Sequence, residues 1–198
     1  MPEAVEVSPS GAVRGEDGLL RCPWGTAGDY LRYHDEEWGV PIRTVTGLYE
    51  RLTLEAFQSG LSWLTILRKR PAFRAAFAGF DPVVVAGFGP DDVDRLLGDP
   101  GIVRNRLKIE AALANAAVVA DWGEGFAETI WSFAAPDRPR PASFAEVPAT
   151  TPASVALAKE LKRHGIRFVG ATTAYALMQA AGLVDDHLVD CHVPHRTR

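Results

Sequence analysis

The sequence predicts an all-α fold of about nine or ten helices. Apolar residues recur at helical spacing from Leu19 almost to the C-terminus. Glycine, proline and N-capping residues divide this pattern into segments of ordinary helix length. The alternation of polar and apolar residues that is typical of strands does not recur, and no Asn-Gly hairpin turn occurs. Three valines at 83–85 could begin a strand, but residues that punctuate helices bound them closely.

The residues at the ends of the predicted helices justify their limits. Asp29, Ser62 and Thr151 are suitable N-caps, Gly60 suits the position after a helix end, and Pro71 suits a first helical turn. A proline-rich segment separates the later helices from the earlier ones. The predicted helices span residues 30–38, 46–59, 63–70, 71–80, 81–88, 89–99, 104–122, 126–134, 152–165 and 171–182.

The length of 198 residues and the mass of 21.4 kDa suit one domain, or two lobes that share a core. Hydrophobic residues make up 47% and charged residues 23% of the chain, which is typical of soluble globular proteins and excludes wholesale disorder. Residues 1–18 are polar and lack apolar periodicity, so we expect a disordered tail there. Residues 19–195 are predicted to form a single domain of two helical lobes.

The charge and the cysteine count restrict the class of protein further. The net charge of −4 argues weakly against a nucleic-acid partner, although an acidic protein can carry a local basic face. No apolar run is long enough to cross a membrane and no secretory signal pattern is present, so we expect a cytoplasmic protein with no membrane partner. Two cysteines argue against a disulfide framework and leave buried thiols, a redox pair or metal ligands as alternatives.

The spacing of cysteines and histidines suggests a metal site that joins the two ends of the fold. Cys22 and His34 lie near the start, and His187 and Cys191 lie four residues apart near the end, on one face if that segment is helical. Two cysteines and two histidines make a tetrahedral zinc set, and four available ligands favour a structural ion over a catalytic one. The alternative is that these are unrelated buried residues, with His192 as a tail residue or a competing ligand.

Aromatic residues follow the first pair of possible metal ligands. Tyr30 and Tyr33 are three residues apart and share a helix face, and Trp38 ends the same predicted helix. Trp63 follows a later helix break. Each of these residues could simply belong to the core. Stacked aromatic rings beside one anion would instead suit a flat, electron-poor or cationic ring.

A carboxylate is predicted on an apolar helix face close to these aromatics. Glu55 lies one and two turns after Leu52 and Leu48, where an acid is costly unless it has a partner or a ligand. Gln58 follows three residues later. The alternative is that Glu55 pairs with Arg51 at the edge of the helix. An acid, an amide and several aromatics within about 35 residues favour a binding or catalytic site.

The segment over 98–116, which consists of a helix end, a tight turn and the start of a new helix, could bind phosphate. Gly101 marks a tight turn, and Arg104, Asn105 and Arg106 lie around the start of the next helix. Backbone amides at a helix N-terminus bind phosphate, and nearby basic residues add attraction. The alternative is an ordinary turn between helices with solvated charges. A second basic cluster, at 68–70 and 74, could extend a DNA footprint.

Six segments of the chain resemble one protein family in their order and spacing. They are RCPW, YHDEEWGVP, LEAFQSGLSWLTIL, GIVRNRLKI, FVGATTAY and GLVDDHLVDC, and together they span about residues 20–192. The family is bacterial 3-methyladenine DNA glycosylase I, within the helix-hairpin-helix glycosylase superfamily. The resemblance implies an all-α glycosylase fold with one structural zinc ion, bound by Cys22, His34, His187 and Cys191.

The resemblance also implies a reaction and the residues that carry it. The enzyme would flip 3-methyladenine out of alkylated double-stranded DNA and hydrolyse its N-glycosidic bond. The catalytic residue would be Glu55, and the base-binding residues would be Tyr33, Trp38, Trp63, Gln58 and Tyr30. None of the four lysines falls in the aromatic pocket motifs, so a monofunctional enzyme that leaves the strand uncut is expected.

The DNA itself would be held by two further segments. Leu61, after Gly60 at a helix break, is the candidate wedge that fills the gap left by the flipped base, with a core leucine as the alternative. Amides over 101–105, together with Arg104, Asn105 and Arg106, would grip the phosphates. We expect a monomer without a protein partner, acting at the nucleoid.

Two other functions compete with this interpretation. A zinc-clamped module could bind DNA or a free purine without catalysis, and a zinc hydrolase would keep one open metal position. Ala176 and Leu177 depart from the family pattern, where a more polar residue is expected in at least some members. That departure concerns the details of the pocket floor.

Overall fold

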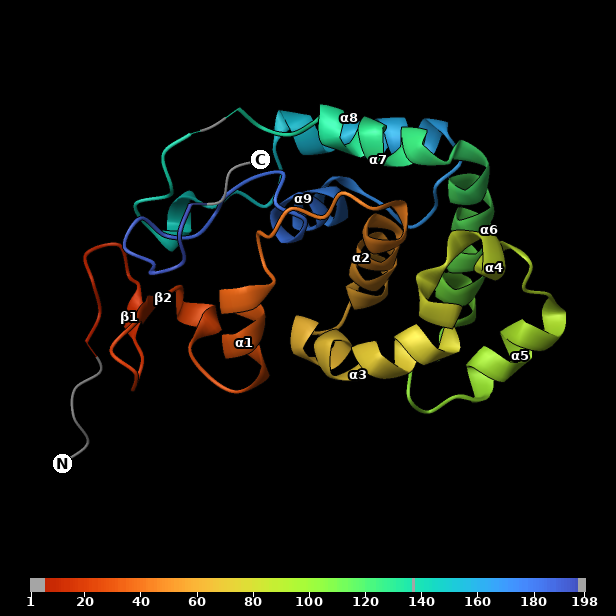
Figure 1. Cartoon of the computed structure of the whole chain (residues 1–198), viewed down its shortest axis with the longest axis horizontal. Coiled ribbons are helices and arrows are strands. Elements are labelled where there is room, and N and C mark those ends of the chain that lie inside the picture. Colours follow the sequence, from red (N-terminus) through yellow and green to blue (C-terminus); the bar gives the residue numbers. More distant parts are fainter. Residues whose placement is uncertain (1–5, 137, 196–198) are drawn as a thin grey trace. The chain divides into compact units, whose positions relative to one another are not determined.

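The computed structural model describes residues 6–136 and 138–195, which form nine α-helices and one small two-stranded sheet (Figure 1). The predominance of helices confirms the predicted fold class. The chain divides into two compact units that interleave along the sequence. The first unit comprises the described parts of segments 1–41, 135–149 and 178–198, and the second comprises residues 42–134 and 150–177. No helix in the described ranges is long and apolar enough to span a membrane.

A β-hairpin opens the first unit. β1 (Val13–Arg14) pairs antiparallel with β2 (Leu20–Arg21), and Val7 bridges to Val13. Ala12 is fully buried, in an apolar cluster with residues near the C-terminus. Residues 6–18 thus have defined partners, which differs from the disordered tail expected over 1–18; residues 1–5 lie outside the described residues. Few apolar side chains occur here, and the buried ones pack against residues near the C-terminus. Local periodicity therefore could not reveal the hairpin.

Two elements complete the first half of this unit. A 3₁₀ turn (Pro23–Gly25) leads into α1 (Asp29–Glu36). Gly28, rather than the predicted Asp29, is the N-cap of α1, and Asp29 occupies the first helical turn. A carboxylate there interacts favourably with the helix dipole.

The second unit begins with two long helices. α2 (Val45–Gln58) is capped by the Thr44 hydroxyl, which accepts a hydrogen bond from the amide of Gly47. α3 (Trp63–Ala76) continues through Pro71, so the predicted helix boundary at this proline is wrong. Proline removes one backbone hydrogen bond. Phe73 is fully buried and its ring lies 4.8 Å from that of Phe57, so packing of the later turns offsets this loss.

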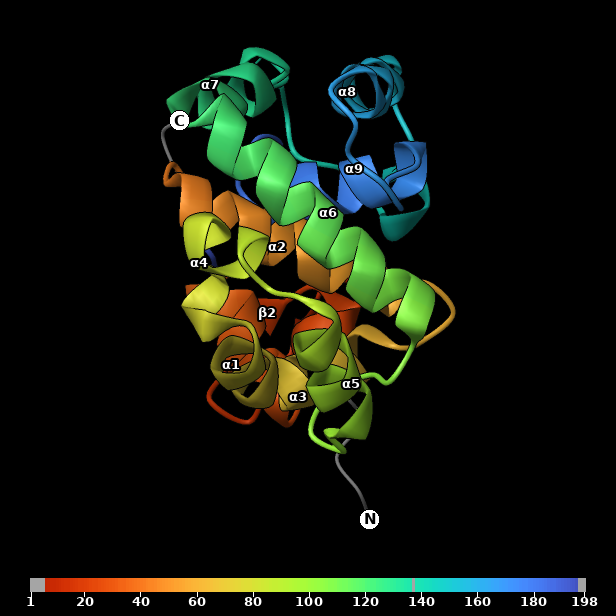
Figure 2. The same ribbon diagram turned by 90° about the vertical axis from the view of Figure 1, so that its right-hand side faces the viewer.

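Both ends of each remaining helix lie within two residues of the predicted ends. These helices are α4 (Pro82–Ala86), α5 (Pro90–Gly98), α6 (Arg106–Trp122), α7 (Glu124–Ser132), α8 (Pro152–Arg163) and α9 (Ala171–Ala180). α6 packs against α2, α4, α5 and α7, and Figure 2 shows it running diagonally in front of α2. This arrangement makes α6 the central support of the second unit.

Candidate functional site

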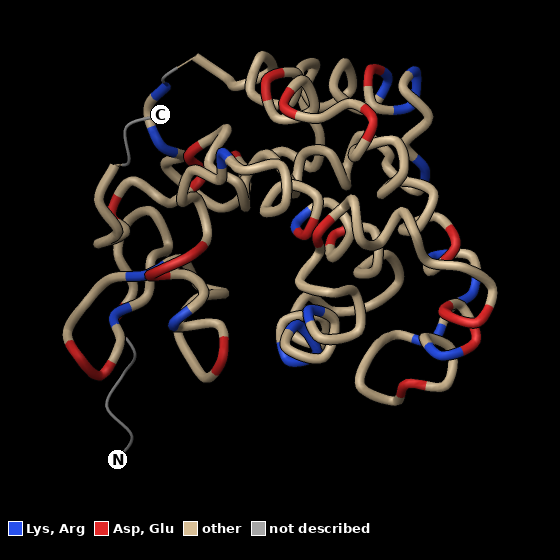
Figure 3. Tube along the Cα trace, turned by 45° about the vertical axis from the view of Figure 1, so that its right-hand side comes forward, with Lys and Arg blue, Asp and Glu red and all other residues tan. Residues whose placement is uncertain are grey.

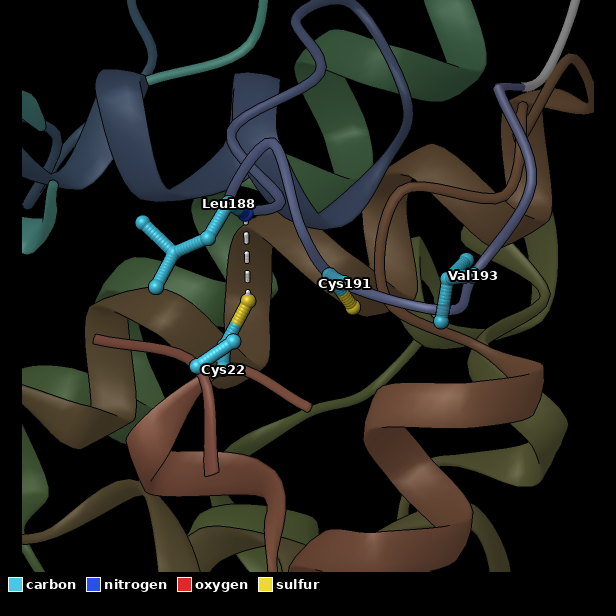
Figure 4. Packing of buried hydrophobic residues seen from close by; sticks show 5 residues of the cluster. Cys22, Leu188, Cys191 and Val193 are labelled. Carbon is cyan, nitrogen blue, oxygen red and sulfur yellow. Dashed lines mark hydrogen bonds between the residues drawn. The ribbon is translucent and has the colours of Figure 1, made fainter. Parts of the chain in front are cut away.

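Four buried side chains from distant parts of the first unit converge on one point. Cys22 follows β2, His34 lies on α1, and His187 and Cys191 lie on the C-terminal segment. Cys191 Sγ is 3.5 Å from His34 Nε2 and 3.6 Å from His187 Nδ1, and Cys22 Sγ is 3.8 Å from His187 Nδ1. Figure 4 shows the two sulfur atoms within an apolar cluster that includes Leu188. The predicted set of four is therefore brought together.

Hydrogen bonds select the nitrogen that each histidine presents. His34 Nδ1 lies 2.8 Å from a carboxylate oxygen of Asp35, and His187 Nε2 lies 3.3 Å from the carbonyl oxygen of Trp38. Both oxygens accept, so these nitrogens carry the protons. His34 Nε2 and His187 Nδ1 are then left with lone pairs that face the two sulfurs. This is the tautomer that a metal ligand requires.

The geometry fits a tetrahedral metal ion. Zinc bonds of about 2.3 Å to sulfur and about 2.0 Å to nitrogen place ligand atoms about 3.3 to 3.8 Å apart. The four ligand atoms here lie within 4.8 Å of one another, and the three closest sulfur–nitrogen distances are 3.5, 3.6 and 3.8 Å. The hydrogen bond between the two thiols lowers the pKa of Cys191, which favours the thiolate form that binds metals, while the same bond and burial raise the pKa of Cys22. The cluster could hold one metal ion.

The route by which His187 and Cys191 meet differs from the prediction. The two residues lie on a turn, not on one face of a helix. The amide of Cys191 donates to the carbonyl of Leu188, at 2.9 Å, and the amide of Leu188 donates to Cys22 Sγ, at 3.4 Å. His192 stays outside the group of four, because its Nε2 contacts Asp35 at 3.0 Å.

A buried arginine connects this cluster to the N-terminal hairpin. Arg21 donates to both carboxylate oxygens of Asp35 and, at 2.7 and 2.8 Å, to Asp17. The hydrogen bond from Arg21 lowers the pKa of Asp17 to about 2. Burial raises the pKa of Asp35, but hydrogen bonds from Arg21, His34 and His192 outweigh it and hold that pKa below its usual range. This network is not predictable from local sequence patterns; the only local signal is that Asp35 directly follows His34.

The predicted aromatic residues of the first unit form one packed group around a tryptophan that sequence analysis did not assign. The ring centre of Trp24 lies 5.8 Å from Tyr30, 6.2 Å from Tyr33 and 4.9 Å from Trp38. It also lies 5.0 Å from the ring of His34, so the aromatic group and the metal cluster share side chains. The RCPW motif was the signal that could have identified Trp24. Removing the metal ligands would therefore disturb the aromatic group as well.

The predicted carboxylate of the second unit is buried. Glu55 on α2 is only 6% exposed, and burial raises its pKa to about 7, with the charge of Arg51 acting in the opposite direction. Arg51 is itself buried, and its guanidinium carbon lies 5.4 Å from the ring centre of Trp63. Arg51 and Glu55 therefore do interact electrostatically, as the alternative expected, but both side chains are buried rather than at the edge of the helix. Glu55 can act in either protonation state near neutral pH.

The turn after α2 exposes the candidate wedge. Gly60 has a φ of +82°, which favours glycine, and Leu61 is 42% exposed, so its assignment as a core residue is wrong. Lys108 on α6 donates to the carbonyl oxygens of Phe57, at 2.9 Å, and Ser59, at 2.6 Å. This buried ammonium group satisfies the carbonyl oxygens at the C-terminal end of α2 that have no partner within the helix, and it holds the turn in place.

The hairpin between α5 and α6 has the predicted tight turn. A Cβ atom at Gly101 would lie 2.8 Å from the Cβ of Ala72 on α3, so only glycine allows this approach. Asn105 is the N-cap of α6, and its side chain accepts from the amide of Lys108. Its carboxamide therefore already has a structural role in the described chain. The amide of Gly101 donates to Asp99, at 2.7 Å.

Basic residues flank the hairpin. Arg104 is exposed, whereas Arg106 pairs with Asp94 at 3.2 Å and with Glu110 at 3.5 Å. Figure 3 shows a second group of basic positions gathered along α3. Lys69 of that group donates to the hairpin carbonyl of Pro100, at 2.8 Å. α3 therefore places positive charge beside the hairpin, as an electrostatic contribution to phosphate binding requires.

On α9, the two residues that depart from the family pattern differ in burial. Ala176 is half-buried and Leu177 is fully buried, so only Ala176 presents any surface there.

Comparison with known sequences gives consistent matches over nearly the whole chain. The profile of the methyladenine glycosylase family matches residues 24–195. The chain is 46% identical over 179 residues to DNA-3-methyladenine glycosylase 1 of Escherichia coli (strain K12), which covers 87% of this chain and 96% of that protein. It is 44% identical over 183 residues to the DNA-3-methyladenine glycosylase of Haemophilus influenzae, with coverages of 86% and 96%.

Solved structures agree with these matches. A crystal structure of 3-methyladenine DNA glycosylase I has a TM-score of 0.83 to this chain at 46% identity, covering 87% of this chain and 98% of that one. The structure of the Staphylococcus aureus 3-methyladenine DNA glycosylase I has a TM-score of 0.82 at 35% identity, with coverages of 89% and 98%. By sequence and by fold, the chain belongs to the methyladenine glycosylase family.

Proposed function

We propose that this protein is a DNA repair glycosylase that excises 3-methyladenine by hydrolysing its N-glycosidic bond. One observation carries the proposal: a fully desolvated carboxyl, Glu55, is retained on an apolar helix of a chain that is 46% identical to a DNA-3-methyladenine glycosylase. A buried acid in that position weakens the fold, so it is expected only where the protein has a use for its carboxyl group. The family relationship supplies the use.

The chemistry of the substrate explains why few catalytic groups are needed. An adenine methylated at ring position three is cationic, so it leaves as a neutral base and its departure needs no general acid. The enzyme must instead extract the base and distinguish it from normal adenine. Glu55 would accept hydrogen bonds from the edge of the adenine. Its negative charge would also stabilise positive charge on the base or on the departing sugar.

Aromatic side chains would provide the second part of the selectivity. We propose that Tyr33, Trp38 and Trp63 stack on the extruded ring, that Tyr30 and Gln58 also contribute to base binding, and that Trp24 supports Tyr33 and Trp38. A cationic ring gains electrostatic attraction from aromatic faces that a neutral ring does not. Normal adenine would lose this attraction and would mismatch the acid at Glu55, so it would be released.

The second unit would hold the DNA. Leu61 would enter the base stack from the exposed turn after Gly60, and the hairpin around Gly101 to Asn105 would bind phosphates. Exposed Arg104 would add charge, as would Arg106 after release from its acidic partners. Partial insertion of an apolar side chain would hold the flipped state open.

The same geometry favours an enzyme that does not cut the strand. Strand cleavage by a glycosylase requires a lysine amine free to attack the sugar. Lys108 is held by two carbonyl oxygens and Lys69 by the hairpin carbonyls. The other two lysines, Lys159 and Lys162, lie on α8, which carries none of the proposed base-binding residues, and Lys162 is assigned below to phosphate. We therefore propose that the product is an intact strand with an abasic site.

We propose that the Cys22, His34, His187 and Cys191 cluster binds one structural zinc ion. Two cysteines and two histidines form a closed tetrahedral set with no position left for water. The ion would supply crosslinking of the two chain ends rather than chemistry on the substrate. Through the contacts of His34 and His187 with Trp24 and Trp38, it would also hold the aromatic group in place.

We also propose that the protein acts as a monomer on double-stranded DNA in the cytoplasm, at the nucleoid. One chain carries the acid, the aromatic group, the candidate wedge and the hairpin, and this supports a monomer. Light scattering of the purified protein would test the oligomeric state, and a dimer mass would contradict this part of the proposal.

Base release from methylated DNA tests the reaction. We expect the zinc-loaded protein to release 3-methyladenine but not 7-methylguanine, and to leave the strand uncut until alkali is added. Release of no base by folded, metal-loaded protein would favour a binding module without catalysis. Strand cleavage without alkali would contradict the assignment of a monofunctional enzyme.

A further inference from the structure

A short loop joins α8 to α9 (Figure 2). It contains a phenylalanine in an unfavourable backbone conformation. Phe168 is 46% exposed and has a φ of +59°, in the left-handed region that bulky side chains seldom adopt. Exposure of a large aromatic ring and backbone strain both oppose the stability of the fold. Such positions persist when surrounding contacts enforce them, and they occur preferentially at functional sites.

Buried contacts of the second unit enforce this loop conformation. Asn115 on α6 is buried and makes two hydrogen bonds to the backbone of Arg167, one as acceptor at 2.7 Å and one as donor at 3.0 Å. Ile166 is also buried, and its amide donates to the carbonyl of Leu161, at 3.0 Å. The backbone on the N-terminal side of Phe168 is therefore held in place, and it keeps the exposed ring at this position in the loop.

A cavity of about 670 Å³ lies beside this ring, lined by residues of the loop and by Ser59. Lys162 and Arg167 also line it, and both are exposed. Among the described residues, neither of these two cations forms an ion pair with a carboxylate. The wall of the cavity thus combines an exposed aromatic ring with two uncompensated positive charges, which complements a nucleic-acid strand.

The cavity also adjoins the turn that carries the candidate wedge. Ser59 immediately precedes Gly60 and Leu61, and Lys108 fixes its carbonyl oxygen. The loop with Phe168 and the turn with Leu61 are therefore two parts of one surface of the second unit. The cavity therefore lies two residues along the chain from the candidate wedge.

We propose that the loop over 164–170 is a second DNA-contacting element, in which Phe168 stacks on a base beside the extruded nucleotide while Lys162 and Arg167 bind the adjoining phosphates. This inference rests on the proposed function, because it takes alkylated duplex DNA as the ligand. The strained backbone would hold the Phe168 ring in position for stacking. This role differs from that of the aromatic group and Glu55, which would bind the extruded base itself.

Fluorescence anisotropy with a duplex containing a tetrahydrofuran abasic-site analogue tests the proposal. Stacking of a base on an aromatic side chain predicts that Phe168→Ala binds this duplex about tenfold more weakly, whereas Phe168→Trp retains binding. Phe144, a 58% exposed phenylalanine of the first unit, provides the matched control, and Phe144→Ala should bind as the wild type does. Lys162→Ala and Arg167→Ala should each reduce the salt dependence by about one phosphate contact.

Two further readouts separate stacking from a structural role. Glycine is favoured at a positive φ, so Phe168→Gly should keep the melting temperature of the wild type while losing the DNA affinity. A 2-aminopurine placed beside the abasic analogue should change fluorescence on saturation by the wild type, and this change should be reduced with Phe168→Gly. A fall in melting temperature with unchanged affinity would show that Phe168 serves the fold, and would overturn the proposal.

The wild-type protein distinguishes failure of this inference from failure of the proposed function. If the wild type releases 3-methyladenine and binds the analogue, but Phe168→Ala behaves like Phe144→Ala, only the second contact is refuted. If the wild type neither releases base nor prefers the analogue over undamaged duplex, the proposed function fails, and this inference fails with it. Binding of free 3-methyladenine should be the same in the wild type and in Phe168→Ala.

Discussion

Replacing Glu55 with Gln is expected to stabilise the fold while removing base release. The pKa of this buried carboxyl is raised from 4.5 to about 7, so the folded state resists an ionisation that the unfolded chain undergoes freely. As the pH rises above 4.5, the unfolded state loses protons first, and the free energy of unfolding falls until the folded-state pKa is passed. Above that pH the cost of keeping Glu55 is constant.

The magnitude follows from the size of the pKa change. At 1.36 kcal/mol for each pKa unit, a rise of about 2.5 corresponds to a destabilisation of about 3 kcal/mol at pH 8 and about 1 kcal/mol at pH 5. The neutral amide of Glu55→Gln avoids this ionisation. For a chain of this length, 3 kcal/mol corresponds to an increase in melting temperature of about 6 to 12 °C at pH 8.

Urea unfolding at pH 5 and pH 8 would measure this difference directly. Glu128→Gln, at an exposed position on α7, is the control for the change from acid to amide without burial. Equal stabilisation of Glu55→Gln at the two pH values, or none at pH 8, would refute the reasoning from burial. Base release should fall sharply in Glu55→Gln, and unchanged release would remove Glu55 from the proposed mechanism.

Three other substitutions, with two control variants, test the metal cluster. Cys191→Ala should lower the zinc content from one ion per chain and lower the melting temperature, whereas His192→Ala should retain the ion. Mass spectrometry of each variant under native conditions shows whether Cys191 or His192 is a ligand. Gly25→Ala would place a Cβ atom 2.4 Å from the ring of His34 and should cost about 1–3 kcal/mol in urea unfolding. Gly98→Ala, with nothing within 4 Å of the new atom, should show no such loss. Asp35→Asn should weaken zinc binding about tenfold or more in a competition titration, because the Asp35 carboxylate orients the His34 ring through its hydrogen bond to Nδ1. Unchanged affinity would contradict that role.

Local patterns predicted most helices because their caps and periodicity lie within a few residues of each other. They failed at Pro71, where the packing of Phe73 on Phe57 decided the outcome, since such a contact is set by the tertiary fold. The same limit explains why the hairpin over residues 6–21 was not predicted, because its burial depends on residues near the C-terminus.

The candidate site shows the same division between local and distant information. The four cysteine and histidine residues were identified from residue type and family motifs, yet the helix proposed for His187 and Cys191 is a turn. Arg21 and Asp17 were missed because a paired buried arginine leaves no periodic signal. Trp24 was missed although its motif had been recognised, because only the packed rings reveal its central place among the aromatic residues.

The discontinuous first unit has a consequence for the order in which the protein folds. The contacts of Cys191 with His34 and of His187 with Cys22 close loops of 157 and 165 residues, whereas residues 42–134 of the second unit are continuous. Long loops close slowly, and their entropic cost must be met before the contact contributes stability. During synthesis, α2 to α7 can therefore assemble while the ribosome is still making the partners of Cys22 and His34. The aromatic group becomes ordered only once the last segment docks, so a prematurely terminated chain could keep Glu55 and Trp63 in a folded second unit while Tyr33 and Trp38 still lack their packed surroundings.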